Sequence, residues 1–113
     1  MVFDRAARVL TRVISQPDNH HLTLDLGHKA VAAENPLDRR VVFQEIPDAT
    51  FVSQSEEHLV IRTDHAEKWQ VGDALLGIPW HICPTVALYD QATAIRDGKV
   101  DGTWDIPARR RYY

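Results

Sequence analysis

An imidazole and a thiol stand two residues apart in the segment Ile78-Pro79-Trp80-His81-Ile82-Cys83-Pro84-Thr85. The surrounding residues predict an extended backbone, and side chains two positions apart on a strand point to the same side. His81 and Cys83 could therefore bind one cation together, and an imidazole nitrogen with a thiolate sulfur suits zinc best among common divalent ions. The two prolines remove backbone donors, so we expect a sheet edge or a strand end, where a pocket can open.

Two ligands do not complete a structural zinc site, which requires four protein ligands. The nearest other candidates come at no recognised zinc spacing: His58, His65, Glu56, Glu57 and Asp90. The pair therefore favours an open site, whose remaining positions belong to water or substrate. The alternative is that neither residue binds metal, because a free cysteine usually packs as a small hydrophobe and a single histidine as a hydrogen-bonded side chain. From these residues alone, packing is the commoner outcome.

The elements that must position this pair are short strands. Apolar runs rich in Val, Ile, Leu and Thr alternate with clusters of Pro, Gly, Asn and Asp, which favours a mainly β fold. The predicted strands are Val9 to Ser15, Leu22 to Leu26, Arg40 to Ile46, Thr50 to Gln54, Leu59 to Thr63, Ala74 to Ile78, Val86 to Tyr89, Ala92 to Arg96 and Thr103 to Ile106. Nine short strands at a spacing of about 8 to 12 residues are typical of a barrel or sandwich. Asp97-Gly98 predicts a tight hairpin.

Length and charge narrow the function classes. A chain of 113 residues is one ordinary domain in size. With 13 Lys and Arg against 16 Asp and Glu, the net charge of −3 favours neither nucleic acid nor an anionic membrane as a partner. The single cysteine, Cys83, excludes an intramolecular disulfide, so we expect a cytoplasmic protein. We expect it to be soluble, because no run approaches the roughly 20 apolar residues of a membrane span and none resembles a signal peptide.

The segment that carries the pair resembles a stretch of the D-threonine aldolase and D-serine dehydratase family, Pro-Asn-His-Val-Cys-Pro-Thr-Val-Asn-Leu. Other matches follow in the same order: Val13-Ile14-Ser15-Gln16-Pro17, Asp25-Leu26-Gly27-His28-Lys29-Ala30, Ser55-Glu56-Glu57-His58, Val71-Gly72-Asp73, Ile95-Arg96-Asp97-Gly98 and Trp104-Asp105-Ile106-Pro107-Ala108-Arg109. The likeness covers nearly the whole chain, so it is far more specific than any single motif. Trp80 departs from the pattern, because the family commonly has Asn there.

The resemblance implies a fold and a metal. In this family a pyridoxal-phosphate (β/α)8 barrel is followed by a β-barrel domain like the C-terminal domain of alanine racemase, with little helix. Residues 1–113 would be that single β-rich C-terminal metal-binding domain, with the pyridoxal-phosphate barrel absent. His81 and Cys83 would bind a divalent ion, zinc or manganese, that acts on the 3-hydroxyl of the substrate. Pyridoxal phosphate would be present only in the complete parent enzyme, a lyase of the aldolase or dehydratase type.

The resemblance also suggests roles for other residues, some in lining the active site and some in maintaining the local structure. His58 and Glu57 are candidates for lining the active site, against the alternative of a solvated loop. We expect Asp25, Gly27 and Lys29 to shape a turn and an ion pair. No lysine of the chain resembles the Schiff-base lysine, so we expect no catalytic activity from the chain alone.

The expected partners are a barrel domain, in the same chain or in another one, and a second copy in a homodimer. Two alternatives stay open. One is a free-standing, non-catalytic β-domain that binds metal or docks a barrel partner. The other is a remnant in which His81 and Cys83 merely pack.

Overall fold

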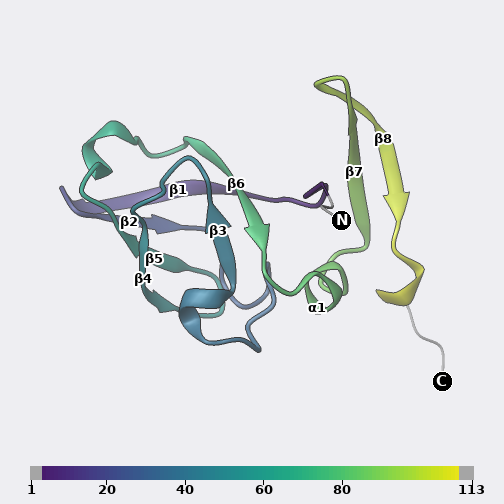
Figure 1. Ribbon diagram of the computed structural model, residues 1–113, viewed down its shortest axis with the longest axis horizontal. Coiled ribbons are helices and arrows are strands. Elements are labelled where there is room, and N and C mark those ends of the chain that lie inside the picture. Colours follow the sequence, from purple (N-terminus) through teal and green to yellow (C-terminus); the bar gives the residue numbers. More distant parts are fainter. Residues whose placement is uncertain (1–3, 110–113) are drawn as a thin grey trace.

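Six antiparallel strands form one curled sheet in the computed structural model, which describes residues 4–109 (Figure 1). The strand order is β3-β6-β1-β2-β5-β4, and the sheet curls into a half-barrel. Its strands are β1 (Val9–Asp18), β2 (His21–Leu24), β3 (Val41–Phe43), β4 (Thr50–Gln54), β5 (Leu59–Arg62) and β6 (Ala74–Pro79). The expected mainly β architecture, with little helix, is confirmed.

The helical elements are short. They are the 3₁₀ turns η1 (Leu37–Arg39), η2 (Ala66–Lys68) and η3 (Pro107–Arg109), and one α-helical turn, α1 (Ile82–Val86). Within residues 4–109, no helix is long and apolar enough to cross a membrane.

Alternation along the strands builds the core. In β1, Val9, Thr11 and Val13 are buried while the residues between them face solvent, as the period of two requires. The buried cluster also includes Leu22, Leu24, Leu26, Val31, Val41, Phe43, Ile46, Leu59, Ile61, Ala66 and Leu75. Register shifts interrupt the pairing of β1 with β2, and such irregularities bend a strand and help to curl the sheet.

A separate hairpin follows the sheet. It consists of β7 (Gln91–Arg96) and β8 (Lys99–Asp105), joined at Asp97 and Gly98. Both turn residues have positive φ, 50° and 75°, the geometry of a tight hairpin turn, so the Asp-Gly prediction is confirmed. Figure 1 shows this hairpin standing away from the six-stranded sheet, joined to it through α1.

One predicted strand is wrong. Val86 to Tyr89 is not extended, because α1 ends at Val86 and a turn follows it. Val86 and Tyr89 are of types that are common in strands, but local hydrogen bonds close the segment into a helical turn instead. The other eight predicted strands are present within residues 4–109. β4 has the predicted bounds, and the other seven have shifted ends, the largest shift being the earlier start of β8 at Lys99.

Candidate functional site

The turn between β6 and α1 carries both residues of the predicted metal pair. β6 ends at Pro79, and Trp80 then donates its backbone N–H to the carbonyl of Arg40 at 3.0 Å. His81 has an extended backbone, with φ −116° and ψ 93°, and Cys83 is the second residue of α1. Both side chains are exposed, so neither is sealed in the core. The expectation that the pair follows a strand end is confirmed.

The expectation that His81 and Cys83 project together from one strand is wrong, because α1 begins at Ile82. Residues two apart on a helix do not face each other, but His81 precedes the helix and is not bound by its periodicity. Pro84 suits this helical start, since it occupies the first turn, where an N–H has no intrahelical acceptor. An ion shared by the pair would therefore have to bind across the strand-to-helix turn.

Two side-chain hydrogen bonds attach this turn to residues 30–32. The hydroxyl of Thr85 donates to the carbonyl of His81 at 2.8 Å and accepts the N–H of Ala32 at 3.0 Å. The hydroxyl of Tyr89 donates to the carbonyl of Ala30 at 2.6 Å. Partial removal of its hydroxyl from water raises the pKa of Tyr89 above its usual value.

The loop 55–58 packs against the segment that leads into residues 30–32. Gly27 lies so close to the backbone of Glu56 that a Cβ at this position would overlap it. His28 donates its N–H to the carbonyl of Ser55 at 2.9 Å. The expected turn at Gly27 is therefore a close backbone contact that only glycine can make.

The ion pair expected at Lys29 is also present. Its Nζ lies 2.5 Å from Oε1 of Glu57, and this hydrogen bond raises the pKa of Lys29. Both side chains are exposed, so the pair contributes little stability. Asp25 has a structural role as well, because it accepts hydrogen bonds from the Thr11 hydroxyl at 2.5 Å and the Arg12 N–H at 2.7 Å.

These contacts place all four predicted site residues at one end of the domain. Glu57 and His58 lie in the β4–β5 loop, which packs on residues 27–29, and the next residues, 30–32, hold α1 with Cys83 and the preceding His81. His58 is exposed, and its carbonyl accepts the N–H of Ser55 at 2.8 Å. The four residues share one end of the sheet, and three of them keep a side chain free of an ion pair within residues 4–109.

The donor set suits an open metal site rather than a closed one. Across residues 4–109, no three His, Cys, Asp or Glu side chains gather in a way that could hold a metal ion. His81 and Cys83 nevertheless offer nitrogen and sulfur donors on the solvent side of the same turn. Such a pair fits an ion whose other ligands come from outside this chain.

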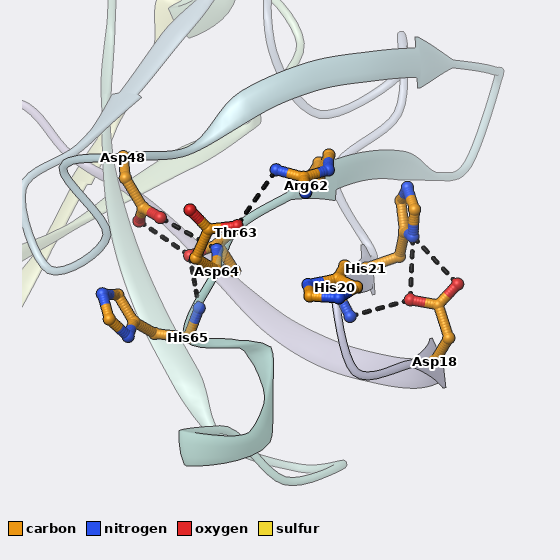
Figure 2. A network of polar contacts seen from close by, with 8 residues as sticks. All are labelled: Asp18, His20, His21, Asp48, Arg62, Thr63, Asp64 and His65. Carbon is orange, nitrogen blue, oxygen red and sulfur yellow. Dashed lines mark hydrogen bonds and ion pairs between the residues drawn. The ribbon is translucent and has the colours of Figure 1, made fainter.

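A polar network occupies the opposite end of the sheet (Figure 2). Asp48 accepts hydrogen bonds from the Thr63 hydroxyl at 2.7 Å and the Asp64 N–H at 2.9 Å, and both lower its pKa. Asp18 contacts Nδ1 of His21 at 2.8 Å, which lowers the pKa of Asp18. These bonds tie turns together at the start of β2 and the end of β5, so the network is structural.

A hollow of about 360 Å³ lies beside this network, lined by Glu45, Ile46, Pro47, Asp48, His65, Lys68, Trp69 and Asp73. It includes none of the predicted site residues. His65, which the sequence offered as another possible ligand, belongs here rather than to the β6–α1 turn.

Comparison with known proteins decides the family. Residues 6–95 match the family described as "Putative serine dehydratase domain". The chain belongs to this serine dehydratase domain family. Its match to a D-threonine aldolase of Arthrobacter sp is 34% identical over 110 residues, which is 96% of this chain but 28% of that enzyme. The chain therefore spans about a quarter of the length of the enzyme that it resembles.

A shorter relative is similar over most of its own length. An uncharacterized protein of Mycobacterium tuberculosis is 31% identical over 107 residues, and the match covers 92% of this chain and 80% of that protein.

Solved structures agree on the fold. D-threonine aldolase from Filomicrobium marinum superposes with a TM-score of 0.85 at 24% identity, over 96% of this chain and 29% of that one. D-threo-3-hydroxyaspartate dehydratase from Delftia sp. HT23 superposes with a TM-score of 0.69 at 22% identity, over 88% and 31%. Two variants of a D-threo-3-hydroxyaspartate dehydratase replace a histidine and a cysteine two positions apart by alanine, and the cysteine variant was solved in the metal-free form.

The sequence did not reveal which residues support the β6–α1 turn. Thr85 and Tyr89 reach residues that lie more than 50 positions earlier in the chain, and no local pattern identifies such contacts. Their only sequence signal was membership of the segment that carries the family resemblance.

Proposed function

We propose that this chain is the metal-carrying C-terminal domain of a pyridoxal-phosphate-dependent lyase that acts on D-3-hydroxy amino acids. The observation that carries the proposal is the pair His81 and Cys83, exposed on one turn of a serine dehydratase domain. The histidine and cysteine replaced in the dehydratase variants have the same spacing of two. That agreement supports a shared metal-binding role.

His81 and Cys83 would hold a divalent ion, zinc or manganese, and leave its remaining positions open. The bound ion would act as a Lewis acid that stabilises negative charge on the 3-hydroxyl oxygen. His58 would line the site from the β4–β5 loop, at the same end of the sheet. Glu57 would line it as well, but its carboxylate is already engaged by Lys29, so His58 is the stronger candidate for a substrate contact.

The lysines of the chain do not fit a Schiff-base role. Lys29 is ion-paired and exposed, Lys68 lies exposed in η2, and Lys99 lies exposed at the start of β8. A Schiff-base lysine is instead activated by burial or by a neighbouring group. The chain would therefore act only with a pyridoxal-phosphate barrel, in the same polypeptide or in a partner, and the complete enzyme would be a homodimer.

The exposed apolar residues of the β7–β8 hairpin support this dependence on a partner. Ile95, Val100 and Trp104 are 63%, 70% and 70% exposed. Monomeric soluble proteins rarely leave such groups together on the surface without a partner. A barrel domain seated on the hairpin would remove them from water.

Zinc titration of the purified protein tests the metal-binding part of the proposal. We expect one equivalent of zinc to bind, and binding to be lost in His81→Ala and Cys83→Ala. His65→Ala is the matched control, because His65 lies exposed at the opposite end of the sheet. Protein that stays metal-free at micromolar zinc, or equal binding by all three variants, would favour the remnant in which the two residues merely pack.

Activity assays test the dependence on a barrel. The chain alone, supplied with pyridoxal phosphate and zinc, should not turn over D-threonine, D-serine or D-3-hydroxyaspartate. The same chain joined to its barrel should turn over at least one of them. Turnover by the chain alone would contradict the proposal. In the active enzyme, His58→Ala should raise KM more than Glu57→Ala does.

The second candidate function is a free-standing domain that docks a barrel partner or binds metal without catalysis. The short Mycobacterium tuberculosis relative favours it, because the match covers 80% of that protein. Affinity capture, with a protein that carries a pyridoxal-phosphate barrel as the probe, distinguishes the two candidate functions. Only a domain that works with a barrel on a separate polypeptide should bind this probe from solution.

A further inference from the structure

We infer that Thr85 is a positioning residue for the metal site, because its buried hydroxyl fixes the turn that carries His81 and Cys83 to residues 30–32 of the β2–β3 loop. This inference rests on the proposed binding of metal by that pair. Thr85 would not bind the ion itself but would determine the positions of the two ligands.

Burial singles out Thr85. Its side chain is 2% exposed, and it is the only buried residue between 79 and 109. Every other residue of α1 is exposed or half-buried. The only side chain that α1 buries is therefore the polar one of Thr85. A buried hydroxyl is retained at little cost only where it is fully hydrogen-bonded.

Both capacities of that hydroxyl are used, and they point in two directions. It donates to the carbonyl of His81 within its own turn, and it accepts the N–H of Ala32 from the β2–β3 loop. A threonine that bonds only to the carbonyl four residues earlier is common in helices and has local effects. Here the second bond turns a local contact into a link between the ligand-bearing backbone and the body of the domain.

Tyr89 provides a second, independent attachment. Its hydroxyl donates to the carbonyl of Ala30 at 2.6 Å, two residues from the bond that Thr85 makes. The two side chains attach α1 and the turn that follows it to one short segment. Cys83 lies between His81 and Thr85, and the bond from the Thr85 hydroxyl to the His81 carbonyl spans it, so this stretch of backbone has little freedom to shift.

The consequence concerns the open metal site. A site with only two protein ligands depends on their prior arrangement, because no third or fourth ligand of the chain corrects a displaced one. Loosening the bond at the His81 carbonyl would let the imidazole and the thiol separate without unfolding the sheet. Metal affinity should therefore fall while the sheet remains folded.

Cobalt(II) provides the readout, because a thiolate ligand gives cobalt a charge-transfer absorption band. The variants are Thr85→Val, which keeps the shape and removes the hydroxyl, and Thr85→Ser, which keeps the hydroxyl. We expect Thr85→Val to weaken cobalt and zinc binding by about 10- to 100-fold, as loss of groups that orient metal ligands typically does. Thr85→Ser should restore both the affinity and the band. Circular dichroism of the sheet should match that of the wild type.

The outcomes separate this inference from the proposed function. If the wild type binds cobalt and Thr85→Val binds it with the same affinity and the same absorption band, the positioning role of Thr85 is overturned. The proposed metal site is unaffected by that result. Absence of the thiolate band in the wild type would overturn both. If Thr85→Val does not fold, Thr85→Ala decides the question, because it also removes the hydroxyl and leaves more room around it, and unchanged metal affinity in that variant would overturn the inference.

Discussion

The six-stranded sheet and the segment that follows it differ in how they are held. The sheet body (residues 9–79) contains the whole apolar core, whereas the C-terminal arm (residues 80–109) contributes one buried residue, Thr85. The body is stabilised by side chains removed from water, and the arm by backbone pairing, by side-chain hydrogen bonds within itself and by two that reach the body. The apolar core that stabilises the fold and the candidate metal ligands therefore lie in different regions, because His81 and Cys83 belong to the arm.

The largest expected contrast is in hydrogen exchange. Amides of β2 and β5 should exchange at least about a thousandfold more slowly than those of β7 and β8 in the isolated chain, because the inner strands open only with global unfolding. Mass spectrometry of the exchanged peptides measures this. Similar protection in both regions would show that the arm folds as one unit with the body.

A core substitution should produce the next largest effect. Leu24→Ala should lower the free energy of unfolding by about 2–5 kcal/mol, because Leu24 is fully buried and its truncation leaves a cavity. Val100→Ala in the arm is the matched control and should change it by at most about 0.5 kcal/mol. Denaturation with urea measures both. Equal losses would contradict the division into a body and an arm.

A smaller effect is expected where the body supports the arm. Gly27→Ala should destabilise the protein by about 1–3 kcal/mol, because the new methyl group overlaps the backbone of Glu56 and forces the loop 55–58 outward. Ser55→Ala, at an exposed position of the same loop, serves as the control. The same urea titration applies, and a neutral Gly27→Ala would show that the loop yields freely.

The smallest effect depends on pH and tests the opposite end of the body. Hydrogen bonds from Thr63 and Asp64 hold the pKa of Asp48 below its usual value near 3.8. A carboxyl group whose pKa is lower in the folded state than in the unfolded state stabilises the protein. This stabilisation is complete at a pH above the unfolded-state pKa and is lost as the pH falls through the folded-state pKa. Asp48→Asn should therefore lower the melting temperature at pH 7, and the difference should shrink as the pH falls below about 3.8 towards the folded pKa of Asp48. A difference independent of pH would show that charge is not involved.

Much of the body could be predicted from the sequence because its pattern is local. Alternating apolar residues identified β1 and β5, and Asp97-Gly98 identified the hairpin turn, since only residues that accept positive φ fit there. The arm was harder. Ile82 and Val86 favoured a strand, whereas Pro84 and the hydroxyl of Thr85 support a helical turn.

The candidate site could be predicted in part. The types and spacing of His81 and Cys83 suggested a ligand pair, but the predicted strand was wrong because a helical turn begins at Ile82, and the contacts that attach this turn to the domain are not local. The bond from Ala32 to Thr85 joins residues 53 positions apart, and no periodicity encodes it. The family resemblance offered Glu57 and His58 as lining residues, but their position at the same end of the sheet as the pair rests on backbone contacts that no sequence pattern encodes.

The exposed position of Cys83 has a redox consequence. Because it is the only cysteine of the chain, it can be oxidised to a disulfide only with a thiol from another molecule. Two chains joined in this way would each lose the sulfur that the candidate ion requires, so air oxidation would produce covalent dimers and abolish metal binding together. Reducing agents should restore both.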